Sequence, residues 1–223
     1  MDYTPSFDFI RQYWGLIVDG ALLTILICVI ATVAGLTIGT VLAGLQTTKR
    51  PIFMAPIRAY VEMIRNTPFL VQLFIFYFGF SSMGFKISAT VAGVIALSIN
   101  TGAYATEIIR AGIESLPRGQ IDAGNALGLT RFQIFKDIIL SQAFRAVYPS
   151  ITNQFILFML GSSVISAIGV HELTFTGNYI SSRTFRSFEV YIFILVVYFA
   201  LSYLFRGMFQ AFQALAFAKI PQR

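Results

Sequence analysis

The sequence predicts an all-α integral membrane protein with five transmembrane helices and additional short helices on the cytoplasmic side. Of its 223 residues, 57% are hydrophobic and 12% are charged, and the mean hydropathy is +0.75. Five stretches contain no Asp, Glu, Lys or Arg, and a polar segment with helical periodicity lies between the third and fourth of them. A soluble domain usually has about 25% charged residues, so an ordinary soluble fold is excluded.

Each charge-free stretch indicates one membrane span. The stretches cover residues 20–48, 66–85, 87–106, 146–170 and 190–205. A helix needs roughly 20 apolar residues to cross the hydrocarbon core, which the first four provide. The fifth is shorter, but it extends towards residue 218 if Arg206 directs its guanidinium to the interface. Within a single transmembrane domain over 20–218, the expected spans are about 20–46, 57–81, 87–110, 146–169 and 188–206.

The distribution of basic residues orients these spans. If the N-terminus is outside, only four of the 16 Lys and Arg residues are outside, namely Arg11, Lys86, Arg183 and Arg186. This bias follows the positive-inside rule, so the loop 111–145 and the tail 219–223 are expected in the cytoplasm. The net charge of +6 reflects topology. The basic residues are dispersed and lack interleaved aromatic residues, so no nucleic-acid partner is expected.

Small residues recur at every fourth position of the first span. Ala31, Gly35, Gly39 and Ala43 continue a GxxxG step along one helix face. Small residues allow helices to approach closely in lipid, so this face is a candidate helix contact. Chance recurrence in a helix rich in Ala and Gly is the alternative. Cys28, the single cysteine, is interpreted as a small packing residue.

The second span combines a proline with an ionic stripe. Pro68 has no N–H group, so it either begins this helix or kinks it. Arg58, Glu62 and Arg65 follow one another at helical steps of four and three residues. They form a stripe at the expected inner interface, and we interpret them as anchors to lipid headgroups.

Polar side chains punctuate the third and fourth spans. Amides and hydroxyls are unfavourable in lipid unless they face another helix or a hydrated cavity. Hydrogen bonding between helices is one interpretation, and a hydrated pathway through the membrane is the other. The candidates for the pathway are Asn100, Thr101, Tyr104 and Glu107 in the third span, and Asn153, Gln154, Ser162 and Ser163 in the fourth.

The segment between these two spans, residues 119–143, is predicted to form two short helices joined at Gly128. Thr130 is the expected N-cap of the second helix. The segment is too polar for lipid and too regular for a flexible loop, so we expect it to present a docking surface in the cytoplasm. Ala123, Ala126 and Leu127 share one face, and Phe132, Phe135, Ile138 and Ile139 repeat on a second.

This segment resembles the EAA loop of bacterial ABC importer permeases. Asp122, Ala123 and Gly124 stand for Glu-Ala-Ala, and Gly128 follows at the expected spacing. Gly124 in place of the second Ala, and Ser141 in place of a proline, depart from the pattern. The chain is similar to the polar amino acid permeases of the histidine, glutamine and arginine type in collinear order, through NTPFLVQLFIFYFG, ATEIIRAGIESLPRGQ, QAFRAVYPSI, IGVHELT and FEVYIFILVVYF.

The resemblance implies a permease subunit of a binding-protein-dependent ABC importer for polar amino acids in the bacterial inner membrane. Residues 1–19 would be periplasmic, and residues 119–140 would couple the chain to a dimer of ATP-binding subunits. The other implied partners are a second permease and a periplasmic or extracellular substrate-binding protein. The implied coupling residues are Asp122, Ala123, Gly124, Ala126, Leu127 and Gly128.

One departure bears on the second permease. The family often has a Lys-Asp pair in the fourth span, where this chain has Leu160 and Gly161. Without that carboxylate, an ammonium group in the membrane lacks a charged partner. We therefore expect the second permease to be non-identical and to provide the main substrate contact.

Other function classes remain as alternatives. The chain contains no G-x-x-x-x-G-K-[ST] string, so we expect it to take its energy from a partner ATPase. His171 is the single histidine, and no catalytic set, metal site or cofactor is expected. A secondary carrier or channel for small polar solutes would not need the cytoplasmic helices, and the internal repeats typical of carriers are not found. An intramembrane enzyme is disfavoured because it would need a catalytic set.

Overall fold

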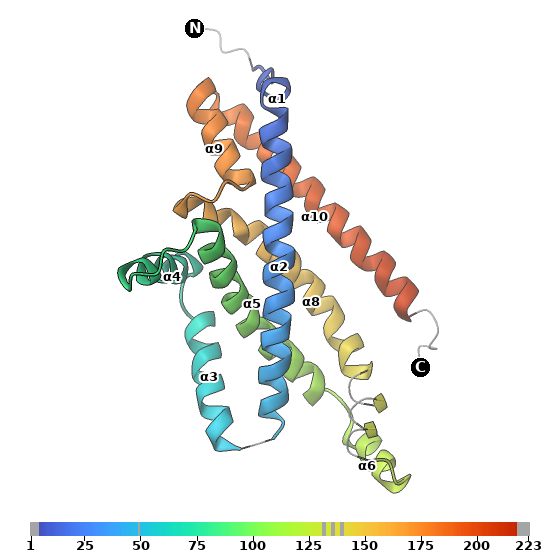
Figure 1. The fold of residues 1–223 in the computed structure, drawn as a ribbon. Coiled ribbons are helices and arrows are strands. Elements are labelled where there is room, and N and C mark those ends of the chain that lie inside the picture. The colour runs from blue at the N-terminus through green and yellow to red at the C-terminus, as the bar shows by residue number, and fades with distance from the viewer. Residues whose placement is uncertain (1–4, 49, 131–132, 135–136, 139–140, 218–223) are drawn as a thin grey trace.

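A computed structural model describes residues 5–48, 50–130, 133–134, 137–138 and 141–217, and within them every secondary-structure element is helical (Figure 1). The predicted all-α class is therefore confirmed. The elements, in chain order, are α1 (Phe9–Gln12), α2 (Trp14–Gln46), α3 (Pro51–Arg65), α4 (Phe69–Ser82), α5 (Ala89–Glu114), α6 (Arg118–Ala126), α8 (Ser141–Gly161), the 3₁₀ helix η2 (Ser162–Ile168), α9 (Leu173–Thr184) and α10 (Ser187–Phe217).

Four helical segments in the described part of the chain are long and apolar enough to cross a membrane. They are Trp14–Gln46, Ala89–Glu114, Gln142–Ile168 and Ser187–Ala216, which match the first, third, fourth and fifth predicted spans. Two bounds differ from the prediction. The first helix already begins at Trp14, inside the segment 1–19, because the exposed Asp19 does not interrupt its backbone hydrogen bonds. The last helix continues past Arg206 to Phe217.

The second predicted span, 57–81, is not a single helix. It is divided into α3, which ends at Arg65, and α4, and the chain changes direction between them (Figure 1). Pro68 causes the division because it cannot donate a hydrogen bond to the carbonyl of Ile64, four residues earlier, and it disfavours helical geometry at Thr67. Of the two expectations for Pro68, a kink or the start of a helix, the structure shows the second, because Pro68 is the N-cap of α4, which has 14 residues.

A side chain replaces the hydrogen bond that Pro68 removes. Gln72 Nε2 donates to the Ile64 carbonyl at 2.7 Å and to the Thr67 carbonyl at 3.1 Å. Asn100 of α5 donates in turn from Nδ2 to Gln72 Oε1 at 2.9 Å. Both amides are buried. The break between α3 and α4 is therefore tied to the centre of α5.

The small residues of the first span form the contact between α2 and α5. A Cβ atom added at Gly35 would lie 2.5 Å from Thr101 Cβ, and one at Gly39 would lie 2.5 Å from Ala105 Cβ and 2.9 Å from its backbone carbon. Ala31 and Ala43 are buried on the same face. The four-residue repeat is therefore a packing face and not a chance recurrence. Cys28 is also buried, as the sequence predicted.

At the end that carries α1, a buried carboxylate joins three helices. Glu172 is the N-cap of α9, and its Oε1 accepts from the backbone N–H of Phe175 at 2.8 Å. Its Oε2 accepts from the Tyr198 hydroxyl of α10 at 2.8 Å. Thr24 of α2 accepts from the backbone N–H of Leu173 at 3.1 Å. Burial raises the pKa of the Glu172 carboxyl, although the hydrogen bonds it accepts act in the opposite direction.

The α2–α5 contact predicts different effects for two glycines of α2. Gly39→Ala should lower the apparent Tm of the purified protein, because overpacking typically costs about 1–3 kcal/mol. Gly44→Ala is the matched control, since an added Cβ there meets nothing within 4 Å. Thermal unfolding in detergent measures both variants. Equal Tm values for the two variants would contradict the proposed packing.

The raised pKa of Glu172 predicts a pH-dependent stability. A raised folded-state pKa means that the carboxyl contributes most below its unfolded pKa, and that this contribution is lost as the pH rises through the folded value. Glu172→Gln stays neutral throughout. The Tm of the wild type minus that of Glu172→Gln should therefore decrease from about pH 4 to pH 8. A constant difference over this range is the opposing result.

Candidate functional site

A cavity of about 1130 Å³ lies between α2, α3 and α5. The described residues that line it include six charged and five aliphatic side chains. Those from α2 and the turn after it are Ala43, Gln46 and Thr47; those from α3 and its end are Met54, Arg58, Val61, Glu62, Arg65 and Asn66; and those from α5 and its end are Tyr104, Glu107, Arg110, Ile113, Glu114 and Leu116.

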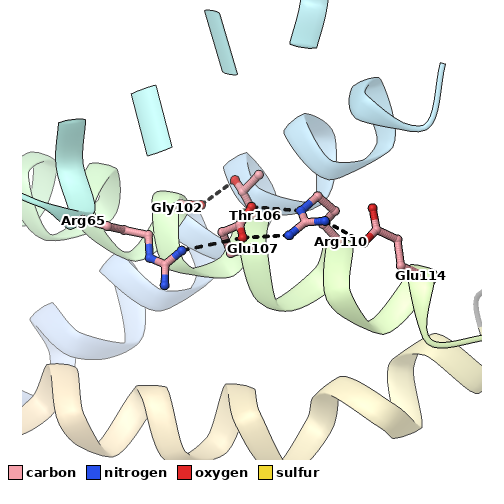
Figure 2. Close-up of polar contacts among 6 residues, drawn as sticks. All are labelled: Arg65, Gly102, Thr106, Glu107, Arg110 and Glu114. Carbon is pink, nitrogen blue, oxygen red and sulfur yellow. Dashed lines mark hydrogen bonds and ion pairs between the residues drawn. The ribbon is translucent and has the colours of Figure 1, made fainter. Parts of the chain in front are cut away.

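Glu107 is at the centre of the charged wall of this cavity (Figure 2). Its Oε1 and Oε2 accept from Arg110 Nε and Nη2, both at 2.9 Å, in a bidentate pair. Arg65 of α3 lies on the other side, with Nη1 3.6 Å from Glu107 Oε2. Arg110 Nη1 also contacts Glu114 Oε2 at 2.6 Å. The four side chains thus alternate in sign along the wall.

The ionic stripe of α3 belongs to this cavity. Arg58, Glu62 and Arg65 all line it, and Arg65 lies 5.2 Å above the ring of Tyr104 as well as beside Glu107. The interpretation of the stripe as headgroup anchors is therefore wrong for Arg65, because its partners are side chains of α5. With Glu107, Arg110 and Glu114, the described lining contains three cations and three anions.

The third-span candidates separate into two groups. Tyr104 and Glu107 line the cavity, and their role in a pathway stays a prediction. Asn100 is buried against Gln72, and Thr101 is buried against Gly35 of α2. For Asn100 and Thr101 the structure shows contacts between helices, which was the alternative interpretation of these polar groups.

The fourth-span candidates do not reach the cavity. The hydroxyls of Ser162 and Ser163 donate to the carbonyls of Met159 and Leu160, at 2.7 and 2.8 Å. Asn153 lines a separate groove between α8 and α10, and Gln154 is half-buried on α8. Because these four residues lie outside the lining of the cavity between α2, α3 and α5, their place in a pathway stays a prediction.

The structure contains the predicted turn at Gly128, with the backbone conformation and hydrogen bonds of a helix end. Gly128 has φ +73°, and its N–H donates to the Asn125 carbonyl at 3.0 Å, while Leu129 N–H donates to the Gly124 carbonyl at 3.1 Å. This is a Schellman ending for α6. Thr130 Oγ1 then accepts from Gln133 N–H at 3.3 Å, and Gln133 Oε1 accepts from Thr130 N–H at 2.9 Å. The reciprocal pair is a capping box, which confirms Thr130 as an N-cap.

The predicted coupling residues lie on two sides of α6. Asp122, Ala123, Ala126 and Leu127 are exposed, and Leu127 has 79% of its surface accessible. Gly124 instead faces inward, where an added Cβ would lie 2.9 Å from Ile138 Cδ1 and 3.1 Å from Ile134 Cγ1. The Gly in place of the family's Ala thus permits close packing. Of the second predicted face, Phe132, Phe135 and Ile139 lie outside the described residues.

The sequence did not lead us to predict two residues of the cavity wall, Arg110 and Glu114, or the role of Gln72 at the break between α3 and α4. Arg110 and Glu114 follow Glu107 at steps of three and four, so their shared helix face was available as a signal. Gln72 gave a weaker signal. It is a single amide in the apolar run after Pro68, and only the folded chain shows that it replaces the lost hydrogen bond.

Comparisons with known proteins extend this picture. The family described as "Binding-protein-dependent transport system inner membrane component" matches residues 35–216. A putative glutamine transport system permease protein of Rickettsia bellii is 39% identical over 173 residues, which are 77% of this chain and 79% of that protein. A probable glutamine ABC transporter permease protein of Bacillus subtilis is 36% identical over 202 residues, which are 91% of this chain and 92% of that protein.

A solved structure agrees with the sequence relatives. The crystal structure of an amino acid ABC transporter with histidines matches this chain with a TM-score of 0.88 and 34% identity, covering 95% of this chain and 99% of that chain. The matched family region, 35–216, contains α6 and every described residue that lines the cavity. The chain therefore belongs to the family of binding-protein-dependent transport system inner membrane components, as a multi-pass membrane permease.

Proposed function

We propose that this chain is the permease subunit of an ABC importer for polar amino acids, and that it couples to ATP-binding subunits through residues 119–140. The observation that carries the proposal is the exposed corner of α6 at Leu127, held rigid by the Schellman ending and the capping box. Leu127 continues the exposed apolar face of Ala123 and Ala126, and a contiguous apolar patch exposed on a polar helix indicates a docking surface. Relatives named as glutamine permeases support an amino acid as the substrate.

In the proposed assembly, this chain works with three other kinds of component. A dimer of ATP-binding subunits supplies the energy, and each copy docks on one permease. A second permease, which we propose to be non-identical, completes the pathway. A periplasmic or extracellular binding protein delivers the amino acid to the face that carries α1 and α9. In this orientation the N-terminus lies outside, and the C-terminus and α6 lie in the cytoplasm.

The cavity suits a zwitterionic amino acid. Arg65 and Arg110 can attract a carboxylate, and Glu107 can attract an ammonium group, within a space bounded by three helices. The alternation of sign keeps the net charge of the described wall at zero, so a neutral polar substrate is not repelled. Conformational change driven by the ATP-binding subunits then alters access to this space, and the permease performs no chemistry itself.

The docking surface can be tested without disturbing the fold. Leu127→Glu places a charge on a side chain that makes little contact within the chain, so membrane insertion should stay normal. Substrate-stimulated ATPase activity of the reconstituted transporter should fall about tenfold, because the coupling free energy is lost. Met83→Glu is the matched control, since Met83 is 74% exposed at the end of α4. Normal coupling in Leu127→Glu would overturn the assignment.

The pathway can be tested at Glu107. Glu107→Gln keeps the shape of the side chain but removes the negative charge between Arg65 and Arg110. Amino acid uptake into liposomes should fall, while ATPase activity without substrate stays close to the wild-type level. Asp19→Asn, which neutralises an exposed carboxylate on α2, should leave uptake unchanged. Wild-type uptake by Glu107→Gln would exclude this wall from the pathway.

A further inference from the structure

A second polar site lies between α8 and α10, away from the cavity. It is a groove of about 270 Å³, and α10 contributes Arg206, Gln210 and Gln213 at helical steps of four and three. Asn153 and Thr152 face them from α8. Arg206, Asn153, Gln210 and Gln213 are all exposed. The groove therefore presents one cation and several neutral hydrogen-bonding groups on the outer surface of the bundle.

The base of the groove is closed by firm contacts between the two helices. Tyr148 donates from its hydroxyl to the Phe209 carbonyl at 2.8 Å, and its ring stacks on Phe212 at 5.7 Å. Phe155 packs against Phe205 and Phe209, with ring centroids 4.9 and 5.2 Å apart. These contacts join α8 and α10 beside the groove.

Arg206 is the one charged residue among the described residues that line this groove. Within the described part of the chain its guanidinium has no acidic partner, whereas Arg65, Arg110 and Arg186 all have one. A guanidinium offers five N–H donors in a planar fork that suits a phosphate or carboxylate. The neighbouring amides of Asn153, Gln210 and Gln213 add further donors without adding a competing negative charge.

The depth of Arg206 indicates where that anion comes from. Arg206 lies 19 residues after Ser187, the first residue of α10. At 1.5 Å per residue this is about 28 Å, close to the roughly 30 Å thickness of the hydrocarbon core. If α10 enters the membrane near Ser187, the guanidinium reaches the opposite headgroup layer. Lipid phosphates are present at this depth around every span, whereas a protein partner would have to bring an unpaired carboxylate to the same place.

We infer that the groove between α8 and α10 binds the headgroup of an anionic phospholipid. Arg206 binds the phosphate, and Asn153, Gln210 and Gln213 bind the remaining polar atoms of the headgroup. The acyl chains then lie along the exposed apolar side chains of α10, such as Phe199 and Tyr203. Basic pockets between transmembrane helices are suited to such headgroups. With the orientation proposed above, the lipid belongs to the cytoplasmic leaflet.

The test compares two lipids on the purified transporter complex. The complex is delipidated in detergent and incubated with phosphatidylglycerol or phosphatidylethanolamine of the same acyl chains. Native mass spectrometry then counts the lipid retained per permease chain. The wild type should retain the anionic lipid about fivefold better, which corresponds to about 1 kcal/mol per basic residue near the membrane surface. In Arg206→Gln this preference should disappear, and Arg206→Lys should restore part of it.

Arg50→Gln is the matched control, because Arg50 is exposed at the start of α3 and lies outside the groove. It should keep the full preference. The inference is overturned if Arg206→Gln retains the anionic lipid as well as the wild type does. It is also overturned if inorganic phosphate displaces the lipid completely, which would indicate a site for soluble anions. Loss of the second permease from Arg206→Gln, with unchanged lipid retention, would show that this face is a protein interface.

Discussion

The close approach of α2 to α5 is the contact on which the rest of the fold depends. Apolar side chains gain little from leaving lipid for a protein interior, so dense packing must hold these helices together. Gly35 and Gly39 make that packing possible, because they let the α5 backbone come near α2. The other faces of α5 then receive α3 through the hydrogen bond from the Tyr60 hydroxyl to the Ile99 carbonyl, 2.6 Å long, and α8 at Gly112.

The charged cavity follows from this central position of α5. Glu107 and Arg110 leave α5 on the side that faces α3, and the break after Arg65 ends α3 beside them. Charges within a membrane protein persist when each has an opposite charge nearby or contact with water. The bidentate Glu107–Arg110 pair and the Arg65 contact meet the first condition. The volume of the cavity leaves room for water, so the second condition, contact with water, can also be met.

Local signals in the sequence predicted some features of the structure and not others. Charge-free runs identified four long helices, and Gly128 with Thr130 identified the corner after α6, because positive φ and capping depend on neighbouring residues alone. The division at Pro68 was harder to predict, since apolar side chains dominate on both sides of it. The roles of Asn100 and Glu107 also could not be separated. They lie seven residues apart on one face of α5. They differ in their partners, because Asn100 contacts Gln72 of α4 and Glu107 contacts Arg65 of α3.

The contact between Gln72 and Asn100 makes three positions depend on one another in evolution. Pro68 has no N–H group to donate to the Ile64 carbonyl, and the side-chain amide of Gln72 donates to it instead. Asn100 in turn donates a hydrogen bond to the side-chain oxygen of Gln72. Loss of either amide alone exposes an unpaired polar atom to a buried environment, whereas joint replacement of both amides and the proline leaves none. Selection should therefore remove single substitutions at these positions, and Pro68, Gln72 and Asn100 should be kept together or replaced together. Natural variation at these positions is expected to be compensatory.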